Sequence, residues 1–161
     1  MTTREYNNCV DKHADGVFRF VLKNLRDEDD AQDIVQDAFE RLWVNHANVD
    51  ALKARSYLFT TAYHAMIDFI RKMKPQSSLE EAPEAENHTF QNYSDLKEIL
   101  DEALEKLNEI QRSVILLRDY EGYSYKEIGE ITRLNESQVK VYIYRARAFL
   151  KNYIVSPEQV I

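Results

Sequence analysis

The stretch from Gly122 to Lys151 constrains the fold more than any other part of the sequence, because it carries the signals of two helices joined by a tight turn. Ser124 precedes one apolar-periodic segment and is followed by Glu127, while Asn135 precedes a second and is followed by Gln138 at the same spacing. Each pair can form a capping box, in which side chains and backbone N–H groups bond reciprocally at a helix N-terminus. The stretch therefore predicts a helix-turn-helix.

The second segment of this stretch divides into an apolar stripe and a polar outer face. Its apolar residues recur at helical spacing and predict the buried side: Val139, Ile143, Ala146 and Leu150. In a helix-turn-helix the second helix enters the major groove, where Ser, Gln and Lys side chains reach base edges and phosphates. The predicted DNA-binding residues of the whole stretch are Ser124, Lys126, Arg133, Ser137, Gln138, Lys140, Val141, Tyr144, Arg145 and Arg147. The alternative is an ordinary helical hairpin with a solvated basic face.

The composition favours an all-α protein. Three Gly and three Pro among 161 residues indicate helices with short connections rather than β structure. No apolar run approaches membrane-spanning length, and the N-terminus lacks the basic-then-apolar layout of a signal peptide. The single cysteine, Cys9, suits a reducing cytosol. We therefore expect a cytoplasmic protein without membrane insertion.

Charge is segregated along the chain. Residues 27–50 contain eight acids and one base, residues 53–74 five bases and one acid, and residues 75–106 nine acids and two bases. Residues 122–154 hold six Lys/Arg and three Glu in a chain whose net charge is −7, so any DNA contact must come from local patches. Alternating blocks of this kind suggest surfaces with different partners, although each block alone could be a solvated helix face.

The chain order predicts two small helical domains. Amphipathic helices are expected near residues 5–25, 30–46 and 55–74, with residues 45–54 as a loop. On the first helix the predicted core stripe is Val10, Ala14, Val17, Phe18, Val21, Leu22 and Leu25. Residues 75–92 are acidic and aperiodic and predict a flexible linker. The predicted domains are therefore residues 1–74 and 93–155.

Helices of the second domain should begin at caps and end at a glycine. Ser94 and Asn108 are the predicted N-caps of its first two helices, and Gly122 is predicted to end the second of them in a left-handed conformation. Residues after Ser156 form a short tail with no evident role.

Two faces of the first domain are candidate binding surfaces. On the helix near 30–46, polar residues lie opposite the apolar stripe and form either a docking surface or a solubilising face: Gln32, Asp33, Gln36, Asp37, Glu40 and Arg41, with Trp43 at the edge. The helix near 55–74 mixes aromatic and basic residues, a combination that holds unstacked single strands but also occurs in ordinary cores. The candidates on this helix are Tyr57, Tyr63, His64, Arg71 and Lys72.

Segments of both halves resemble the extracytoplasmic-function (ECF) sigma factors of bacterial RNA polymerase. Gln-Asp-Ile-Val-Gln-Asp-Ala-Phe-Glu-Arg-Leu-Trp at 32–43 resembles the polymerase-binding helix of the family. Residues 127–147 resemble its helix-turn-helix, which reads the minus-thirty-five promoter element. Tyr57-Leu58 and residues 67–71 resemble its promoter-melting helix, which meets the minus-ten strand. The resemblance spans residues 5–153 and implies three partners, namely core RNA polymerase, promoter DNA and an anti-sigma factor.

The chain departs from the family pattern at three positions. Arg133 stands where the family often has Gly in the turn, which would cost free energy if its φ is positive. Asn108 replaces a frequent Pro and is an adequate cap. His64 replaces a frequent Asn implied in recognising an extruded promoter base, so the base preference is expected to differ.

Three alternative functions fit the sequence less well. A stand-alone helix-turn-helix regulator would need a dimer for two half-sites, and the sequence has no heptad or evident dimer helix. An enzyme would need a nucleophile–base pair, a phosphate loop or a metal cluster; the four histidines are dispersed, and no cofactor, metal or catalytic residue is predicted. An interaction protein without a DNA role fits the basic second helix of the helix-turn-helix poorly.

Overall fold

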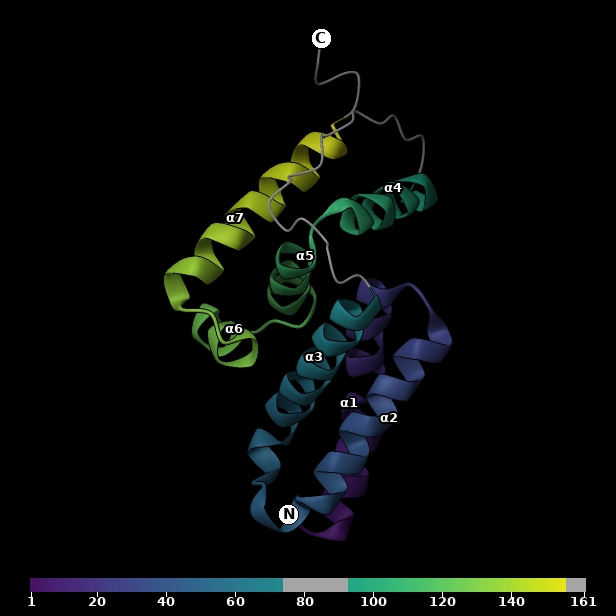
Figure 1. Cartoon of the computed structure of the whole chain (residues 1–161), viewed down its shortest axis with the longest axis vertical. Coiled ribbons are helices and arrows are strands. Elements are labelled where there is room, and N and C mark those ends of the chain that lie inside the picture. Colours follow the sequence, from purple (N-terminus) through teal and green to yellow (C-terminus); the bar gives the residue numbers. More distant parts are fainter. Residues whose placement is uncertain (74–92, 156–161) are drawn as a thin grey trace. The chain divides into compact units, whose positions relative to one another are not determined.

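A computed structural model describes residues 1–73 and 93–155, and the regular structure in these ranges is helical throughout (Figure 1). The α-helices are α1 (Thr3–Leu25), α2 (Glu28–Val44), α3 (Ala54–Met73), α4 (Tyr93–Lys106), α5 (Glu109–Ile115), α6 (Tyr125–Thr132) and α7 (Glu136–Tyr153). Short 3₁₀ turns, η1 (His46–Asn48) and η2 (Ala51–Lys53), connect α2 to α3, and a π-helical turn, η3 (Leu116–Tyr120), follows α5. The prediction of an all-α fold is confirmed.

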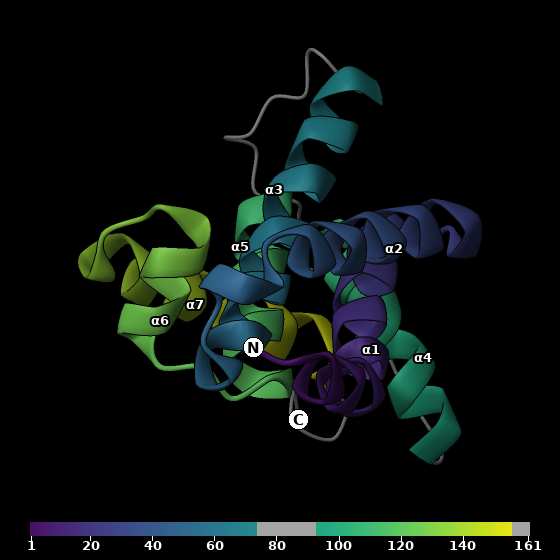
Figure 2. The ribbon, with the colours of Figure 1, turned by 90° about the horizontal axis from the view of Figure 1, so that it is seen from below.

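The first three helices pack on one another and form one compact unit (Figures 1 and 2). Its core is built from apolar side chains of all three helices, including Val17, Phe20, Val21, Ile34, Ala38, Leu42, Leu58, Phe59, Ala62 and Met66. The rings of Phe20 and Phe59 meet edge to face with centroids 5.7 Å apart and join α1 to α3. These helices lie close to the three predicted ones, and the predicted loop at 45–54 contains the turns η1 and η2.

The buried face of α1 differs from the predicted stripe. Phe20 is 1% exposed and Cys9 is also buried, whereas Phe18, Leu22 and Leu25 are only half-buried. The prediction assumed a single apolar stripe, which includes Phe18 and omits Phe20. In the structure α1 packs against both α2 and α3, so its buried face is wider than one stripe.

The second unit is formed around α5 and α7. Both α5 and α4 pack against α7, and η3 continues α5. The core side chains include Leu104, Leu107, Val114, Ile115, Leu116, Leu117, Ile128, Val139, Ile143, Ala146 and Tyr153. The predicted stripe of α7 is buried at Val139, Ile143 and Ala146 and half-buried at Leu150, where it joins a cluster with α4.

Local hydrogen bonds set the helix boundaries in this unit. The Asn108 side chain accepts from the backbone N–H of Gln111 at 2.9 Å, as a cap of α5 should. Gly122 has φ +78°, which confirms the predicted left-handed position. The prediction that Ser94 is the N-cap of α4 is wrong, because α4 begins one residue earlier, at Tyr93, and includes Ser94. The predicted linker at 75–92 and the tail from Ser156 lie outside the described residues.

Candidate nucleic-acid interface

Two capping boxes position the helix-turn-helix. The backbone N–H of Glu127 donates to Ser124 Oγ at 3.1 Å, and the N–H of Ser124 donates to Glu127 Oε1 at 2.9 Å. At the start of α7 the N–H of Gln138 donates to Asn135 Oδ1 at 2.8 Å, and the N–H of Asn135 donates to Gln138 Oε1 at 3.0 Å. Both boxes were predicted. They fix where α6 and α7 begin, and therefore which residues of α7 point outward.

The turn between the two helices contains a left-handed residue that is not glycine. Arg133 follows α6 directly and has φ +63°. This is the position at which helices commonly end on Gly, because a Cβ in the left-handed region contacts the following carbonyl. Arg133, which stands where the family often has Gly, therefore has the positive φ that costs free energy. Its side chain is exposed.

The outer face of α7 is open along its length. Ser137, Val141 and Tyr144 are exposed and share one side of the helix, with Val141 at 45% and Tyr144 at 75%. Lys140, Arg145 and Arg147 are also exposed. A helix that leaves Val and Tyr in solvent between cations offers apolar contact for thymine methyl groups together with charge for phosphates.

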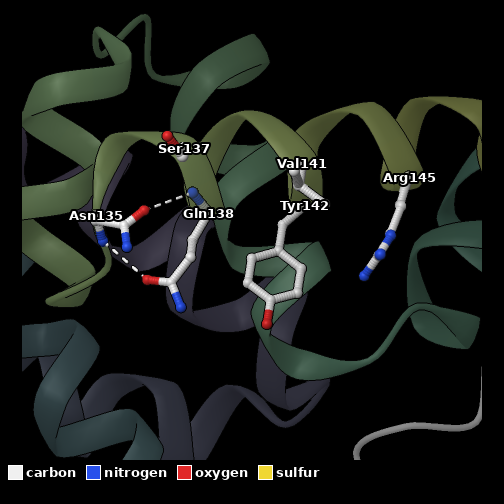
Figure 3. A pocket seen from close by; sticks show the side chains of 6 residues that line it. All are labelled: Asn135, Ser137, Gln138, Val141, Tyr142 and Arg145. Atoms are coloured by element: carbon white, nitrogen blue, oxygen red, sulfur yellow. Dashed lines mark hydrogen bonds between the residues drawn. The ribbon is translucent and has the colours of Figure 1, made fainter.

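One side of this face forms a shallow hollow of about 250 Å³ (Figure 3). The side chains of Gln138, Tyr142 and Arg145 point to the same side of α7 in this view. The residues that line it are Asn135, Ser137, Gln138, Val141, Tyr142 and Arg145. Sequence reasoning did not include Tyr142, because it lies between the buried stripe and the outer face and is half-buried.

The opposite flank of α7 carries an ion pair that the sequence did not predict. Arg147 donates from Nε to Asp119 Oδ2 at 3.3 Å and also from Nη2 to Oδ1. The side chains are 47% and 41% exposed. Hydrogen bonding to Asp119 raises the pKa of Arg147, with the nearby Tyr125 contributing in the same direction. Arg147 was predicted to hold a phosphate, and the structure gives it a carboxylate partner within the protein.

An aromatic ring gathers two further cations on this flank. The guanidinium of Arg118 lies 4.7 Å from the centroid of the Tyr125 ring, and Lys140 Nζ lies 5.8 Å from it. Arg118 also donates to the carbonyl of Tyr123 at 2.9 Å. Arg118 and Tyr125 were not predicted from the sequence, because their proximity to Lys140 depends on contacts between η3, α6 and α7. A Tyr directly after the cap Ser124 was the available signal.

The first unit presents the predicted docking helix. Gln32, Asp33, Gln36 and Glu40 are exposed on α2, opposite the core residues Ile34, Ala38 and Leu42. Asp37 is half-buried and pairs with Arg41, whose Nε lies 3.1 Å from Asp37 Oδ2. The acidic face is thus a continuous surface along the helix, with one acid already neutralised.

Trp43 lies at the end of this face in an aromatic stack. Its ring lies 4.4 Å from that of His46 with an interplanar angle of 9°, and it meets the Tyr6 ring edge to face at 5.0 Å. Tyr6 Oη also donates to the carbonyl of Phe39 at 3.0 Å. Trp43 remains 42% exposed, so contacts from both sides hold the ring in place while part of it faces solvent.

The predicted residues of α3 are not equivalent in the structure. Arg71 and Lys72 are exposed at the end of the helix, whereas Tyr63 is only 6% exposed and its ring is not open for base stacking. His64 follows on the helix, with ring centroids 5.4 Å from Tyr63. The structure therefore favours Arg71 and Lys72 over Tyr63 as surface contacts.

Tyr57 joins α3 to the end of α2. Its Oη accepts from Asn45 Nδ2 at 3.0 Å and donates to the carbonyl of Arg41 at 3.4 Å. Asn45 Nδ2 also donates to that carbonyl at 3.1 Å. The ring is half-buried and lines an open hollow with residues of the α2–α3 connection. Tyr57 thus links the predicted docking helix to the predicted promoter helix.

Within residues 1–73 and 93–155, no group of three or more His, Cys, Asp or Glu side chains is arranged to hold a metal ion. In the same ranges no helix combines the length and apolarity needed to cross a membrane.

The fold and the exposed face of α7 define a DNA-binding protein of the helix-turn-helix class with an additional three-helix unit. Family models agree with this division: "Sigma-70 region 2" matches residues 9–75 and "Sigma-70, region 4" matches residues 97–150. ECF RNA polymerase sigma factor SigW of Bacillus subtilis is 31% identical over 166 aligned positions, which cover 92% of this chain and 88% of SigW. SigM of the same organism is 28% identical, and the alignment covers 86% of this chain and 88% of SigM. The chain belongs to the ECF sigma factors, which direct core RNA polymerase to promoters.

Solved structures give the same fold. The sigma factor RpoE of Bartonella quintana, determined in complex with the anti-sigma factor NepR, is 22% identical and has a TM-score of 0.75 over 94% of this chain and 97% of RpoE. CnrH, determined with the cytosolic domain of CnrY, is 25% identical and has a TM-score of 0.69. The match covers 93% of this chain and 87% of CnrH.

Proposed function

We propose that the two units divide the work of promoter recognition in the cytoplasm, with residues 1–74 binding core polymerase and the minus-ten element and residues 93–155 binding the minus-thirty-five element. The observation that carries the proposal is the outer face of α7. It exposes Ser137, Val141 and Tyr144 between the flanks that hold Lys140 and Arg145, directly after a doubly capped turn. This is the layout by which a helix reads base edges from a position fixed by phosphate contacts.

Core polymerase would dock on the exposed face of α2. The supporting features are the row Gln32, Asp33, Gln36 and Glu40 and the partly exposed ring of Trp43 at its end. An immobilised aromatic ring beside polar side chains is typical of interface anchors, because little side-chain entropy is lost on binding. The internal pair of Asp37 with Arg41 makes Asp33 the more accessible of the two acids.

The end of α3 would meet the minus-ten strand through Arg71 and Lys72. Both are exposed at the helix C-terminus, and Tyr57 ties the other end of α3 to α2. Residues 75–92 would connect the two units. A partner of the anti-sigma class would hold the chain inactive, a proposal supported by the RpoE structure determined with NepR.

The experiment reconstitutes the chain with core polymerase and maps transcription start sites on genomic DNA. Addition of the chain should create a reproducible set of new starts. Lys140→Ala should weaken binding at all of these sites and reduce the salt slope by about one. Ser137→Ala, which removes only a hydroxyl from the outer face, should instead change the ranking of sites. Polymerase that starts at the same places with and without the chain would refute the proposal.

A further inference from the structure

The ion pair between Asp119 and Arg147 joins η3 to the flank of the helix that is proposed to read DNA. It uses two donors of the guanidinium, Nε and Nη2, and the two carboxylate oxygens, so the pair is bidentate. Both side chains lie near the surface, and they are 28 residues apart in sequence. The pair is therefore made by the tertiary fold, at a place where DNA phosphate could reach Arg147.

Arg147 lies on the same side of α7 as Lys140, because positions seven apart in a helix fall on one face. Lys140 and Arg118 lie at the Tyr125 ring, a contact that does not neutralise their charges. Arg147 belongs to the same cationic flank but has a carboxylate bonded to it. The flank therefore holds three cations, one of which is neutralised by Asp119.

We propose that Asp119 is a brake on sequence-independent DNA binding: it holds Arg147 and keeps this cation from contacting the phosphate backbone. The proposal rests on the proposed role of α7 and specifies how its affinity is restrained. A free Arg on this flank would contact phosphate at any sequence and would release counterions on binding. With Asp119 in place, phosphate must displace a carboxylate from the guanidinium or approach a neutral pair.

The free energy needed to break the Asp119–Arg147 pair is modest, so the pair would weaken DNA binding without abolishing it. Exposed ion pairs are weak, so removal of Asp119 should raise affinity roughly two- to five-fold at low salt rather than by orders of magnitude. The release of Arg147 should also add one phosphate contact, which steepens the dependence of log K on log salt by about 0.9. The net charge of −7 acts in the same direction by repelling DNA at long range.

The test measures binding of the full chain to a mixed-sequence duplex of about 30 bp between about 50 and 200 mM salt, a range over which phosphate contacts are resolved. Asp119→Asn removes the charge and keeps the shape of the side chain. It should bind the duplex more tightly and with a steeper salt slope. The double variant Asp119→Asn with Arg147→Gln should lose both gains, because the released cation is gone and the net charge equals that of the parent.

A matched control is Glu98→Gln, which changes the net charge equally at an exposed position of α4. It should raise affinity less than Asp119→Asn and leave the salt slope unchanged. Circular dichroism of each variant reports whether the helices are intact. If Asp119→Asn weakens binding with its helices intact, Asp119 orients Arg147 for phosphate instead of withholding it, and the brake is refuted.

A further variant separates the two proposals. If Lys140→Ala leaves binding of the same duplex unchanged, α7 is not the DNA-binding helix, and the proposed function and the brake both fail. If Lys140→Ala weakens binding while Asp119→Asn leaves both affinity and slope unchanged, the brake alone fails.

Discussion

Replacement of Arg133 by glycine should stabilise the helix-turn-helix. Arg133 has φ +63° at the position directly after α6. A left-handed conformation costs an L-residue with a Cβ about 1–2 kcal/mol, and Gly avoids this cost. Gly also gives the unfolded chain more freedom, which offsets about 0.4–1 kcal/mol. The net expectation for Arg133→Gly is a stabilisation of about 0.5–1 kcal/mol.

Urea unfolding of the full chain followed by far-UV circular dichroism measures this change. With a slope of about 1–3 kcal/mol per M, the midpoint should rise by about 0.2–1 M. Fluorescence of Trp43, the one tryptophan of the chain, follows the end of α2 and gives a second unfolding signal. Hydrogen exchange of α6 and α7 peptides locates the effect, because amide protection reports local opening.

Two controls separate backbone strain from charge. Arg133→Lys keeps both the Cβ and the charge and should leave the midpoint unchanged, and Arg133→Ala should do so within about 0.5 kcal/mol. Arg26 is a matched site, since it ends α1 with φ +61° and its N–H donates to the carbonyl of Leu22 at 2.8 Å. Arg26→Gly should raise the midpoint reported by Trp43. A lower midpoint in Arg133→Gly with intact helicity would refute the strain argument.

Further predictions concern single residues of both units. Asp33→Lys should weaken binding to immobilised core polymerase without lowering helicity, and equal affinity would contradict the docking role of α2. Gln138→Ala should lower the unfolding free energy by about 0.5–1 kcal/mol, because the N–H of Asn135 loses its acceptor, whereas Gln138→Glu should keep stability and weaken DNA binding in a salt-titrated assay. Burial, together with the charges of Arg55 and Lys12, lowers the pKa of His13. As the pH falls through the ordinary histidine pKa, the imidazole of His13 is therefore protonated in the unfolded chain before it is protonated in the folded chain, and the folded state loses stability. Stability measured by urea unfolding should decline less over this pH range in His13→Gln than in the parent. Burial raises the pKa of the Cys9 thiol, so a thiol reagent should label the folded chain more slowly than the urea-unfolded chain at the same pH.

The sequence by itself determined the features that depend on neighbouring residues. The boxes at Ser124 and Asn135 follow from side chains that reach backbone N–H groups three positions away, and these bonds form wherever the local helix forms. The left-handed Gly122 and the buried stripe of α7 follow equally from local conformation and helical period. For this reason the order of the helices and the outward residues of α7 were predictable.

Contacts between elements were decided only by the tertiary structure. Nothing in the local sequence indicates that Asp119 will neutralise Arg147, because the two residues are 28 positions apart and lie in different elements, η3 and α7. The bond from Tyr57 to the end of α2 and the choice of Phe20 over Phe18 for the core arise in the same way. A helix period gives the direction of a side chain from its own axis, whereas its partner is set by the position of another helix, and that position results from packing of the whole core.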